Sequence, residues 1–128
     1  MTTVSPGAVL QRAEVPALLV SDLTNIRYIT GLQVSAGLVL VTKRRVFLFV
    51  DSRYTDMAKR KAAQGGFAVR DLKDLETVMR DIRHCGFEGD TLTVQRFANW
   101  KRTFKNTKFV QTSGLLDSIR REKTREEL

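Results

Sequence analysis

Two short segments carry the residue types that could form a site. The first, "NIRYITGLQVSAG" at 25–37, places the polar side chains of Asn25 and Arg27 beside Tyr28, ahead of a loop bounded by glycines. The second, "DSRYTDMA" at 51–58, sets Arg53 at a strand-to-helix junction. Amide, guanidinium and phenol groups bind and orient polar ligands. Such groups at the carboxyl ends of strands are where open α/β sheets bind ligands or partners.

A purely structural role is the alternative for each segment. In that interpretation the arginines pair with nearby carboxylates, and the tyrosines pack with a tethered hydroxyl. Packing is favoured for Tyr54, because Tyr54, Met57 and Ala58 share helical spacing. For the loop from Gly31 to Gly37 both interpretations stay open, since functional residues concentrate on loops.

The residues that would break bonds are missing from the pattern. The only histidine, His84, is expected at the end of a helix, where it interacts with the helix dipole rather than acting as a base. No Cys-x-x-Cys, Asp-x-Asp, Gly-x-Ser-x-Gly or phosphate-binding loop occurs. We expect no catalytic residue and no metal ligand in this chain. The acidic residues fall at expected helix starts and in loops, where capping explains them: Asp22, Asp51, Asp56, Asp71, Asp74, Asp81, Glu88 and Asp90.

Composition narrows the class of protein. The chain has 128 residues, 42% of them hydrophobic and 28% charged. These values are typical of one soluble domain. Its single cysteine, Cys85, excludes a disulfide framework. No apolar run approaches the length of a membrane span, and the N-terminus lacks the pattern of a secretory signal. We therefore expect a cytoplasmic protein that does not contact membranes.

The net charge of +8 raises the question of nucleic-acid binding. The basic residues are spread along the chain, with short clusters at 43–45 and 59–61. No RNA-recognition, zinc-finger or helix-turn-helix signature accompanies them. A solvated basic surface is therefore the favoured interpretation over a nucleic-acid interface.

Alternating apolar strands and amphipathic helices predict the elements that position the two segments. Continuous apolar runs predict strands at 17–20, 36–42, 46–51 and 67–70, with shorter ones near 85–88 and 108–111. Helices are expected at 6–13, over a short turn ending at Gly31, at 53–64, from Asp74 to about 82, along 97–104, and from about 113. The order predicts an α/β sandwich, with helices on both faces of a mixed sheet.

Local signals mark where these elements begin and end. Ser5 followed by Pro6 reads as a helix start. Asp51-Ser52 and Asp74 are expected to cap the next helices, and Gly65-Gly66 is expected to end one of them. The "KRR" at 43–45 predicts a tight antiparallel hairpin, although it lacks the usual Asn-Gly turn chemistry.

The last segment predicts a helix that needs a partner. Leu115, Leu116 and Ile119 give a stripe facing the core, whereas "RREKTREEL" is almost entirely charged. So polar a helix frays unless something covers it. We expect residues 1–128 to form a single domain whose final helix, about 113–128, leads into a further domain.

Four segments in order resemble the amino-terminal domain of the creatinase and Xaa-Pro peptidase family. They are "ALLVSDLTNIRYITGLQVSAGLVLVT", "FLFVDSRYTDMAK", "GFEGDTLTVQRF" and "VQTSGLLDSIRREKTREEL". That domain typically reads Asn-Ile-x-Tyr-Leu-Thr-Gly-Phe, a small-residue loop, a Leu/Val strand and then Thr-Asp-x-Arg-Tyr. The matching residues are Asn25, Ile26, Tyr28, Thr30, Gly31, Asp51, Arg53 and Tyr54.

The resemblance implies a fold and a function. The implied fold is a three-layer α/β/α domain with a six-stranded mixed sheet, similar in topology to ribonuclease H. The implied function is that of a non-catalytic domain in a dimeric Xaa-Pro peptidase, of the aminopeptidase P or prolidase type. Its two divalent ions (Mn, Co or Zn) would be held by a separate carboxyl-terminal "pita-bread" domain. The implied partners are that catalytic domain, a second copy of the protein, and the peptide substrate.

In many dimers of this family the amino-terminal domain lies over the active-site cleft. The candidates for substrate access or dimer contact are Asn25, Arg27, Tyr28, Gly31, Gln33, Ser35 and Arg53. Val34 stands where many peptidases have a smaller residue, and Leu32 replaces the usual aromatic residue. Three alternatives remain: a creatinase-like or inactive homologue, a free-standing module that binds nucleic acid, and a binder of small molecules.

Overall fold

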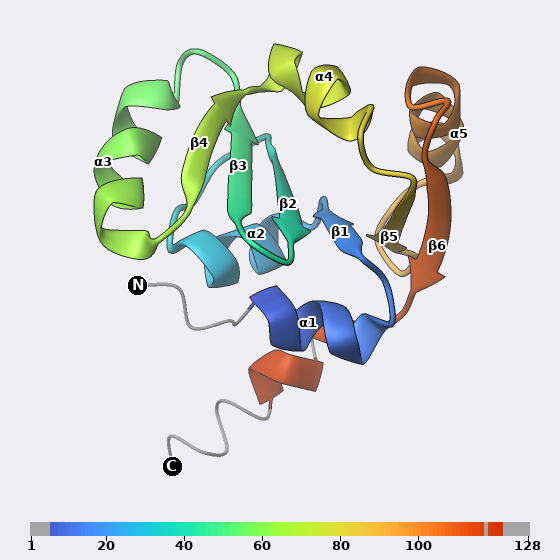
Figure 1. The fold of residues 1–128 in the computed structure, drawn as a ribbon. Helices are drawn as coiled ribbons and strands as arrows, with labels where there is room; N and C mark the ends of the chain where they lie inside the picture. The colour runs from blue at the N-terminus through green and yellow to red at the C-terminus, as the bar shows by residue number, and fades with distance from the viewer. Residues whose placement is uncertain (1–5, 117, 122–128) are drawn as a thin grey trace.

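The computed structural model describes residues 6–116 and 118–121, and within them the chain alternates strands and helices (Figure 1). The strands are β1 (Ala17–Val20), β2 (Leu38–Thr42), β3 (Val46–Val50), β4 (Ala68–Asp71), β5 (His84–Glu88) and β6 (Lys108–Thr112). The helices are α1 (Pro6–Ala13), α2 (Leu23–Thr30), α3 (Thr55–Gly65), the 3₁₀ turn η1 (Leu72–Asp74), α4 (Leu75–Met79) and α5 (Val94–Thr103).

The six strands form one mixed sheet in the order β4-β3-β2-β1-β5-β6. β2 pairs antiparallel with both β1 and β3, whereas β1 with β5, β3 with β4 and β5 with β6 pair in parallel. Every strand except β2 therefore runs in one direction. The predicted six-stranded mixed sheet is confirmed, and the antiparallel hairpin at 43–45 is confirmed with it.

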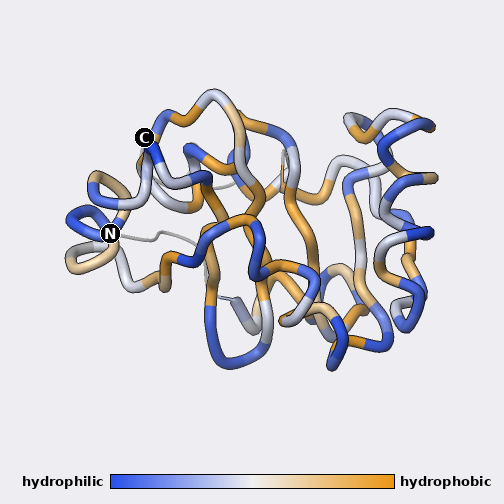
Figure 2. Tube along the Cα trace, turned by 90° about the horizontal axis from the view of Figure 1, so that it is seen from above, coloured by the Kyte–Doolittle hydropathy of each residue, from blue (hydrophilic) through white to orange (hydrophobic). Residues whose placement is uncertain are grey.

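Side chains from the two faces of the sheet belong to two separate cores. Leu18, Val39 and Leu48 join the core that α1, α2 and α3 cover, and Leu116 reaches the same core. Leu19, Leu40 and Phe49 join the core that α4 and α5 cover. Because successive strand residues point to opposite faces, strands buried on both faces must be apolar throughout. Figure 2 shows this as hydrophobic stretches along the central strands and hydrophilic turns at their ends. The three-layer sandwich is thus confirmed.

The hairpin turn closes through a threonine instead of a glycine. Thr42 donates its backbone N–H to the Arg45 carbonyl at 2.9 Å. Its hydroxyl donates to the same carbonyl at 3.0 Å and accepts the Arg45 N–H at 3.2 Å. These side-chain bonds replace the Asn-Gly turn chemistry that the sequence lacks.

Two of the expected helix caps are wrong in detail. Asp51 accepts the Arg53 N–H at 2.9 Å, but α3 begins only at Thr55. Asp74 makes no capping hydrogen bond, and Asp71 instead caps the preceding 3₁₀ turn through Lys73 N–H at 3.0 Å. In both places a carboxylate two residues ahead of the donor forms a local turn before the helix begins. The expected ends at Gly31 and Gly66 are confirmed, each with a left-handed backbone conformation.

The position of His84 is also wrong in the sequence interpretation. α4 ends at Met79, so His84 lies outside it and begins β5 as an exposed residue. Leu75 and Met79 of α4 are buried. The helix expected along 97–104 is present as α5, and Phe97, Trp100 and Phe104 pack in the second core.

The chain after β6 turns back onto the first core. Residues 115–116 and 118–121 are helical, and Leu116 is buried with Leu115 and Ile119 packed against it, as the stripe predicts. The expected cap at Ser5 and the rest of the final helix fall outside the described residues. Within the described residues, no helix is long and apolar enough to cross a membrane.

Candidate functional site

The sheet topology brings both sequence segments to one edge of the sheet. β1 and β3 run parallel, so α2 after β1 and the "DSRY" turn after β3 both begin at the carboxyl edge. The expectation that the two segments follow the carboxyl ends of strands is confirmed. The loop between Gly31 and Gly37 returns the chain to β2 at this same edge.

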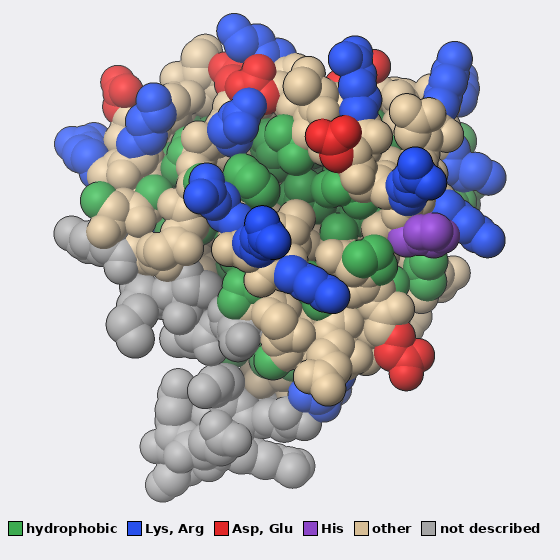
Figure 3. All heavy atoms as spheres, viewed as in Figure 1, with side chains coloured by type: hydrophobic (Ala, Val, Ile, Leu, Met, Phe, Trp, Pro, Cys, Tyr) green, Lys and Arg blue, Asp and Glu red, His purple; other side chains and the backbone are tan. Residues whose placement is uncertain are grey.

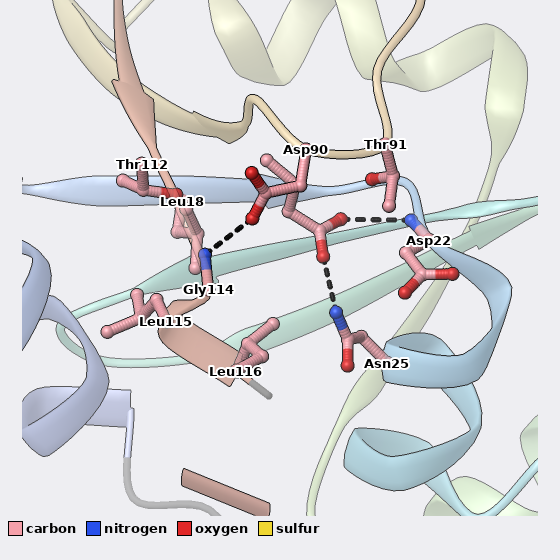
Figure 4. Close-up of a pocket in the computed structure, with 10 residues that line it drawn as sticks. Leu18, Asp22, Asn25, Asp90, Thr91, Thr112, Gly114, Leu115 and Leu116 are labelled. Carbon is pink, nitrogen blue, oxygen red and sulfur yellow. Dashed lines mark hydrogen bonds between the residues drawn. The ribbon is translucent and has the colours of Figure 1, made fainter. Parts of the chain in front are cut away.

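Asn25 is held by a buried carboxylate from a distant strand. Glu88, the last residue of β5, accepts the Asn25 side-chain amide at 2.5 Å through Oε2. Its Oε1 accepts the backbone N–H groups of Ser21 at 2.7 Å and Asp22 at 2.9 Å. Figure 4 shows the bonds to Asp22 and Asn25. Glu88 therefore satisfies two free donors at the start of α2. Asp22 accepts the Thr24 N–H at 3.3 Å as the local cap. One carboxylate thus ties β1, β5 and α2 together.

The environment of Glu88 disfavours its charged form. Burial raises the pKa of the Glu88 carboxyl above its ordinary value, since its exposed fraction is only 8%. The hydrogen bonds from Asp22, Asn25 and Ser21 lower that pKa, and the nearby charge of Asp22 raises it again. The net effect is upward, which is the expected result when desolvation outweighs hydrogen bonding.

Two polar atoms on α2 lack partners in the described part of the chain. Asn25 Oδ1 and Tyr28 Oη are buried and form no hydrogen bond there. Tyr28 is half-buried against the first core, so the expected packing is present without the expected tether of its hydroxyl. Arg27, between them, is exposed, and its carbonyl accepts the Gly31 N–H at 2.7 Å.

The Gly31–Gly37 loop is anchored by alternate side chains. Leu32 and Val34 are buried in the first core, whereas Gln33 and Ser35 are exposed. The hydroxyl of Thr30 accepts the Leu32 N–H at 3.1 Å and fixes the exit from α2. A loop with its apolar residues in the core presents its polar residues in a fixed position.

The position of Gly31 tolerates other residues poorly. Its φ of 76° lies in the left-handed region, and a Cβ there would lie 3.0 Å from Lys61 Cε. The ammonium-bearing chain of Lys61 thus lies over the carboxyl end of α2, where positive charge is favourable.

Tyr54 joins the second segment to the loop. Its hydroxyl shares a hydrogen bond of 2.6 Å with Ser35 Oγ, and its ring is packed against the first core. The structural role expected for Tyr54 is therefore confirmed. Arg53 lies over the Tyr54 ring at 5.6 Å and pairs with Asp51 at 2.8 Å, which holds the pKa of the Asp51 carboxyl below its ordinary value. The Arg53 side chain is 74% exposed, so its pairing is local, as the structural alternative requires.

The candidates from the sequence thus form two groups. Gly31, Gln33, Ser35 and Arg53 lie together around the loop, with Tyr54 between loop and turn. Asn25 lies at the opposite end of α2 and is bound to Glu88. The structure shows what holds each of these residues, but their roles in substrate access and dimer contact stay predictions.

The cavity beside Asn25 is small and polar. Its volume is about 20 Å³. That is enough for one water but not for a peptide. It is lined by Leu18, Asp22, Asn25, Glu88, Asp90, Thr91, Thr112, Gly114, Leu115 and Leu116 (Figure 4). Asp90 accepts the Gly114 N–H at 2.6 Å and so ties the end of β6 to the loop after β5. This cavity is a junction of elements and does not have the size of a substrate site.

The local sequence pattern does not identify Glu88 as the partner of Asn25. The capping role that the pattern predicts for Glu88 is correct in kind, because its carboxylate accepts the N–H groups of Ser21 and Asp22 just before α2. The Asn25 that it binds lies 63 residues earlier in the chain. The only signal was a glutamate directly after an apolar strand, in "CGFE".

The described residues hold no group of three or more His, Cys, Asp or Glu side chains placed to bind a metal ion. Cys85 is buried in the second core, and burial raises the pKa of its thiol to about 12. Such a thiol stays protonated at neutral pH and is a poor nucleophile.

Known proteins share this fold and sequence pattern. The model of the creatinase/prolidase N-terminal domain matches residues 7–121. An uncharacterised peptidase of Bacillus subtilis, YqhT, is 26% identical over 120 residues, which cover 89% of this chain and 34% of that protein. The chain therefore spans about a third of that relative.

Solved structures agree. The N-terminal domain of the cytoplasmic peptidase PepQ from Mycobacterium tuberculosis superposes with a TM-score of 0.76 at 28% identity, covering 89% of this chain and 94% of that one. The Xaa-Pro dipeptidase of Bacillus anthracis gives a TM-score of 0.76 at 25% identity, over 91% of this chain and 34% of that enzyme. Because the family model matches almost the whole length of this chain, the chain belongs to the creatinase/prolidase N-terminal domain family.

Proposed function

We propose that this chain is the non-catalytic amino-terminal domain of a cytoplasmic Xaa-Pro peptidase, of the aminopeptidase P or prolidase type. The observation that carries the proposal is the match of the whole domain to about one third of a Xaa-Pro dipeptidase, at 25% identity. In this proposal the remainder of such a protein supplies the reaction. The cytoplasmic location extends the description of PepQ to this chain.

The proposed contribution of this domain is substrate access and dimerisation through the Gly31–Gly37 loop. The loop is held at both ends, because Leu32 and Val34 are buried and Ser35 is tied to Tyr54. The amide of the exposed Gln33 can meet a peptide or a second subunit. Loops that cover an active site exclude water and limit substrate length, and both effects require a fixed loop position.

The two divalent ions of such a peptidase do not fit the described residues of this chain, which offer no suitable group of ligands. We therefore assign the ions to the proposed catalytic domain. This chain would act on the reaction only by shaping access to it, and a creatinase-like or inactive homologue remains the alternative.

The test uses the natural polypeptide that contains this chain. We expect hydrolysis of an Xaa-Pro dipeptide and of a longer Xaa-Pro peptide with Mn²⁺ or Co²⁺. Gln33→Ala should change KM for the longer peptide more than kcat for the dipeptide. The matched control is Gln95→Ala, an exposed glutamine on α5 outside the proposed site. Sedimentation of the same variants reports on dimerisation.

Two outcomes contradict the proposal. Hydrolysis of either peptide by the present chain alone would place catalysis in this domain. Identical kinetics for Gln33→Ala, Gln95→Ala and the natural protein, with no change in subunit association, would remove the loop from substrate access and dimerisation.

A further inference from the structure

The two edges of the sheet differ in charge. The β2–β3 turn at 43–45 directly precedes β3, Arg83 precedes β5, and Lys108 begins β6. Because β3, β5 and β6 run in the same direction, these residues share the amino edge of the sheet. Lys105 lies in the turn before β6 and joins them. The carboxyl edge mixes both signs, because Arg53 and Lys73 lie beside the acidic residues that end or follow its strands: Asp22, Asp51, Asp71, Glu88 and Asp90.

The cations of the amino edge, defined as Lys43, Arg44, Arg45, Arg83, Lys105 and Lys108, are all exposed. The ion pairs Arg53–Asp51 and Arg70–Asp74 lie elsewhere. Three described carboxylates lie near the amino edge: Glu14 after α1, Asp81 before β5, and Glu76, which lines a surface pocket with Lys105. The cations therefore outnumber these acids, and the edge stays positive. Figure 3 shows how far Lys and Arg side chains outnumber acidic ones on one face of the molecule.

The turns that carry these cations are held in place. Arg45 is bonded to Thr42 through both backbone and hydroxyl, and its guanidinium lies 6.0 Å from the centre of the Phe47 ring. The hydroxyl of Thr107 donates to the Ile82 carbonyl at 2.7 Å, and Lys108 N–H donates to the Arg83 carbonyl at 2.7 Å. The charged side chains thus extend from a fixed frame, which reduces the entropy lost on binding.

We infer that the amino edge binds the phosphate backbone of nucleic acid without reading its sequence. From β3 to β6 the edge includes five neighbouring strands, which are separated by four inter-strand spacings. At about 4.8 Å for each spacing, the edge is roughly 19 Å long. Phosphates follow one another about every 3.4 Å along each strand of a duplex, so the edge can face about five of them. The carboxyl edge, where acids and cations are mixed, offers such a ligand no comparable row of cations.

An acidic protein surface is the competing ligand, and the composition of the edge favours nucleic acid. Protein interfaces usually centre on buried aromatic anchors. Along the amino edge the large apolar side chains beside the cations are Phe47, Ile82 and Phe109, all partly buried and packed against the second core. The exposed large hydrophobic side chains among the described residues include no aromatic one, and a row of exposed lysines and arginines is typical of phosphate contacts.

The test measures fluorescence anisotropy of a labelled 20-base-pair DNA duplex of random sequence with the protein. We expect binding at 50 mM salt that weakens by about 40- to 500-fold at 200 mM, the dependence for roughly three to five phosphate contacts. The double variant Arg44→Glu/Arg45→Glu and the double variant Lys105→Glu/Lys108→Glu should each bind at least tenfold more weakly and show a shallower salt dependence.

The matched control is Lys59→Glu/Arg60→Glu, which makes the same change in net charge at two exposed positions of α3. We expect less than a threefold loss for this control. Equal losses in all three variants would show a net-charge effect and overturn the assignment to the amino edge. Absence of binding at 50 mM salt would overturn it as well. Displacement of the duplex by a poly-glutamate peptide of equal charge, at equal concentration, would assign the edge to acidic proteins instead.

Discussion

Replacing Glu88 tests the central contact of the candidate site. Glu88→Ala removes the acceptor for Ser21 N–H, Asp22 N–H and the Asn25 amide. A buried donor left without a partner costs about 1–3 kcal/mol. Part of this is offset because the buried charge disappears with the side chain. We expect Glu88→Ala to lower the free energy of unfolding by about 2–4 kcal/mol.

Glu88→Gln separates the hydrogen bonds from the charge. The glutamine oxygen can accept both backbone N–H groups, while its amide faces the Asn25 amide. Rotation of the Asn25 side chain brings Oδ1, which has no partner among the described residues, to that amide. We therefore expect a change within about 1 kcal/mol at pH 7, since the hydrogen-bond count is nearly conserved.

The pH dependence gives the sign of the burial effect. The pKa of Glu88 is raised above its ordinary value of 4.5. At a pH between this ordinary value and the raised pKa of the folded state, the folded state therefore binds more protons than the unfolded state. The contribution of Glu88 to stability is then full below pH 4.5 and declines as the pH rises through its folded-state pKa. Glu88→Gln lacks this decline, so its stability relative to the natural protein should improve from pH 4 to pH 7.

Urea unfolding of both variants at pH 4, 5.5 and 7 measures these differences, with Glu76→Ala as the control. Glu76 is an exposed acid of α4. Its replacement should leave stability within about 0.5 kcal/mol of the natural protein, as is usual for surface positions. The reasoning fails if Glu88→Ala is no more destabilising than the control. It also fails if Glu88→Gln loses stability relative to the natural protein as the pH rises, because hydrogen bonding would then outweigh burial.

Three further predictions concern the loop. Tyr54→Phe removes the bond to Ser35. It should cost about 1 kcal/mol, with faster amide exchange in the loop by mass spectrometry; unchanged exchange at 31–37 would show that this bond does not hold the loop. Gly31 has a φ of 76°, and a Cβ there would crowd Lys61. Gly31→Ala should therefore cost about 1 kcal/mol or more in urea unfolding, whereas a neutral result would refute the strained geometry. The pair of Arg53 with Asp51 is exposed. Arg53→Ala should leave Tm within about 2 °C, and a large drop in calorimetry would mean that Arg53 is buried.

The strands were predictable because their physical requirement is simple. A strand covered on both faces must be apolar at successive positions. "ALLV" and "VFLFV" meet that requirement without ambiguity. The strand order was not predictable from local pattern, because nothing in β1 specifies that β5, far later in the chain, lies beside it. The resemblance to a known family supplied the architecture that periodicity alone could not.

The predictions of helix starts were wrong where two local structures compete for the same side chain. Asp51 and Asp71 each bond an N–H two residues ahead and form a turn, whereas the sequence pattern assigned the caps to Asp51-Ser52 and Asp74. Aspartate stabilises both arrangements, and the choice depends on where the strand leaves the sheet. His84 was misplaced because the helix was expected to run to about residue 82, whereas α4 ends at Met79 and β5 begins at His84.

The contact between Asn25 and Glu88 also gives the polar residues of the segment "NIRYITG" a structural role. Asn25 fixes the start of α2 through Glu88, Thr30 bonds back to the Ile26 carbonyl at its end, and Gly31 reverses the chain. These polar positions of the segment therefore act on the helix itself. The end of α2 sets where the Gly31–Gly37 loop begins, and Gln33 is exposed on that loop. Polar side chains that look like a ligand site in sequence here set the position of a neighbouring loop, and the exposed residues of that loop are the ones to which the proposed function assigns substrate access.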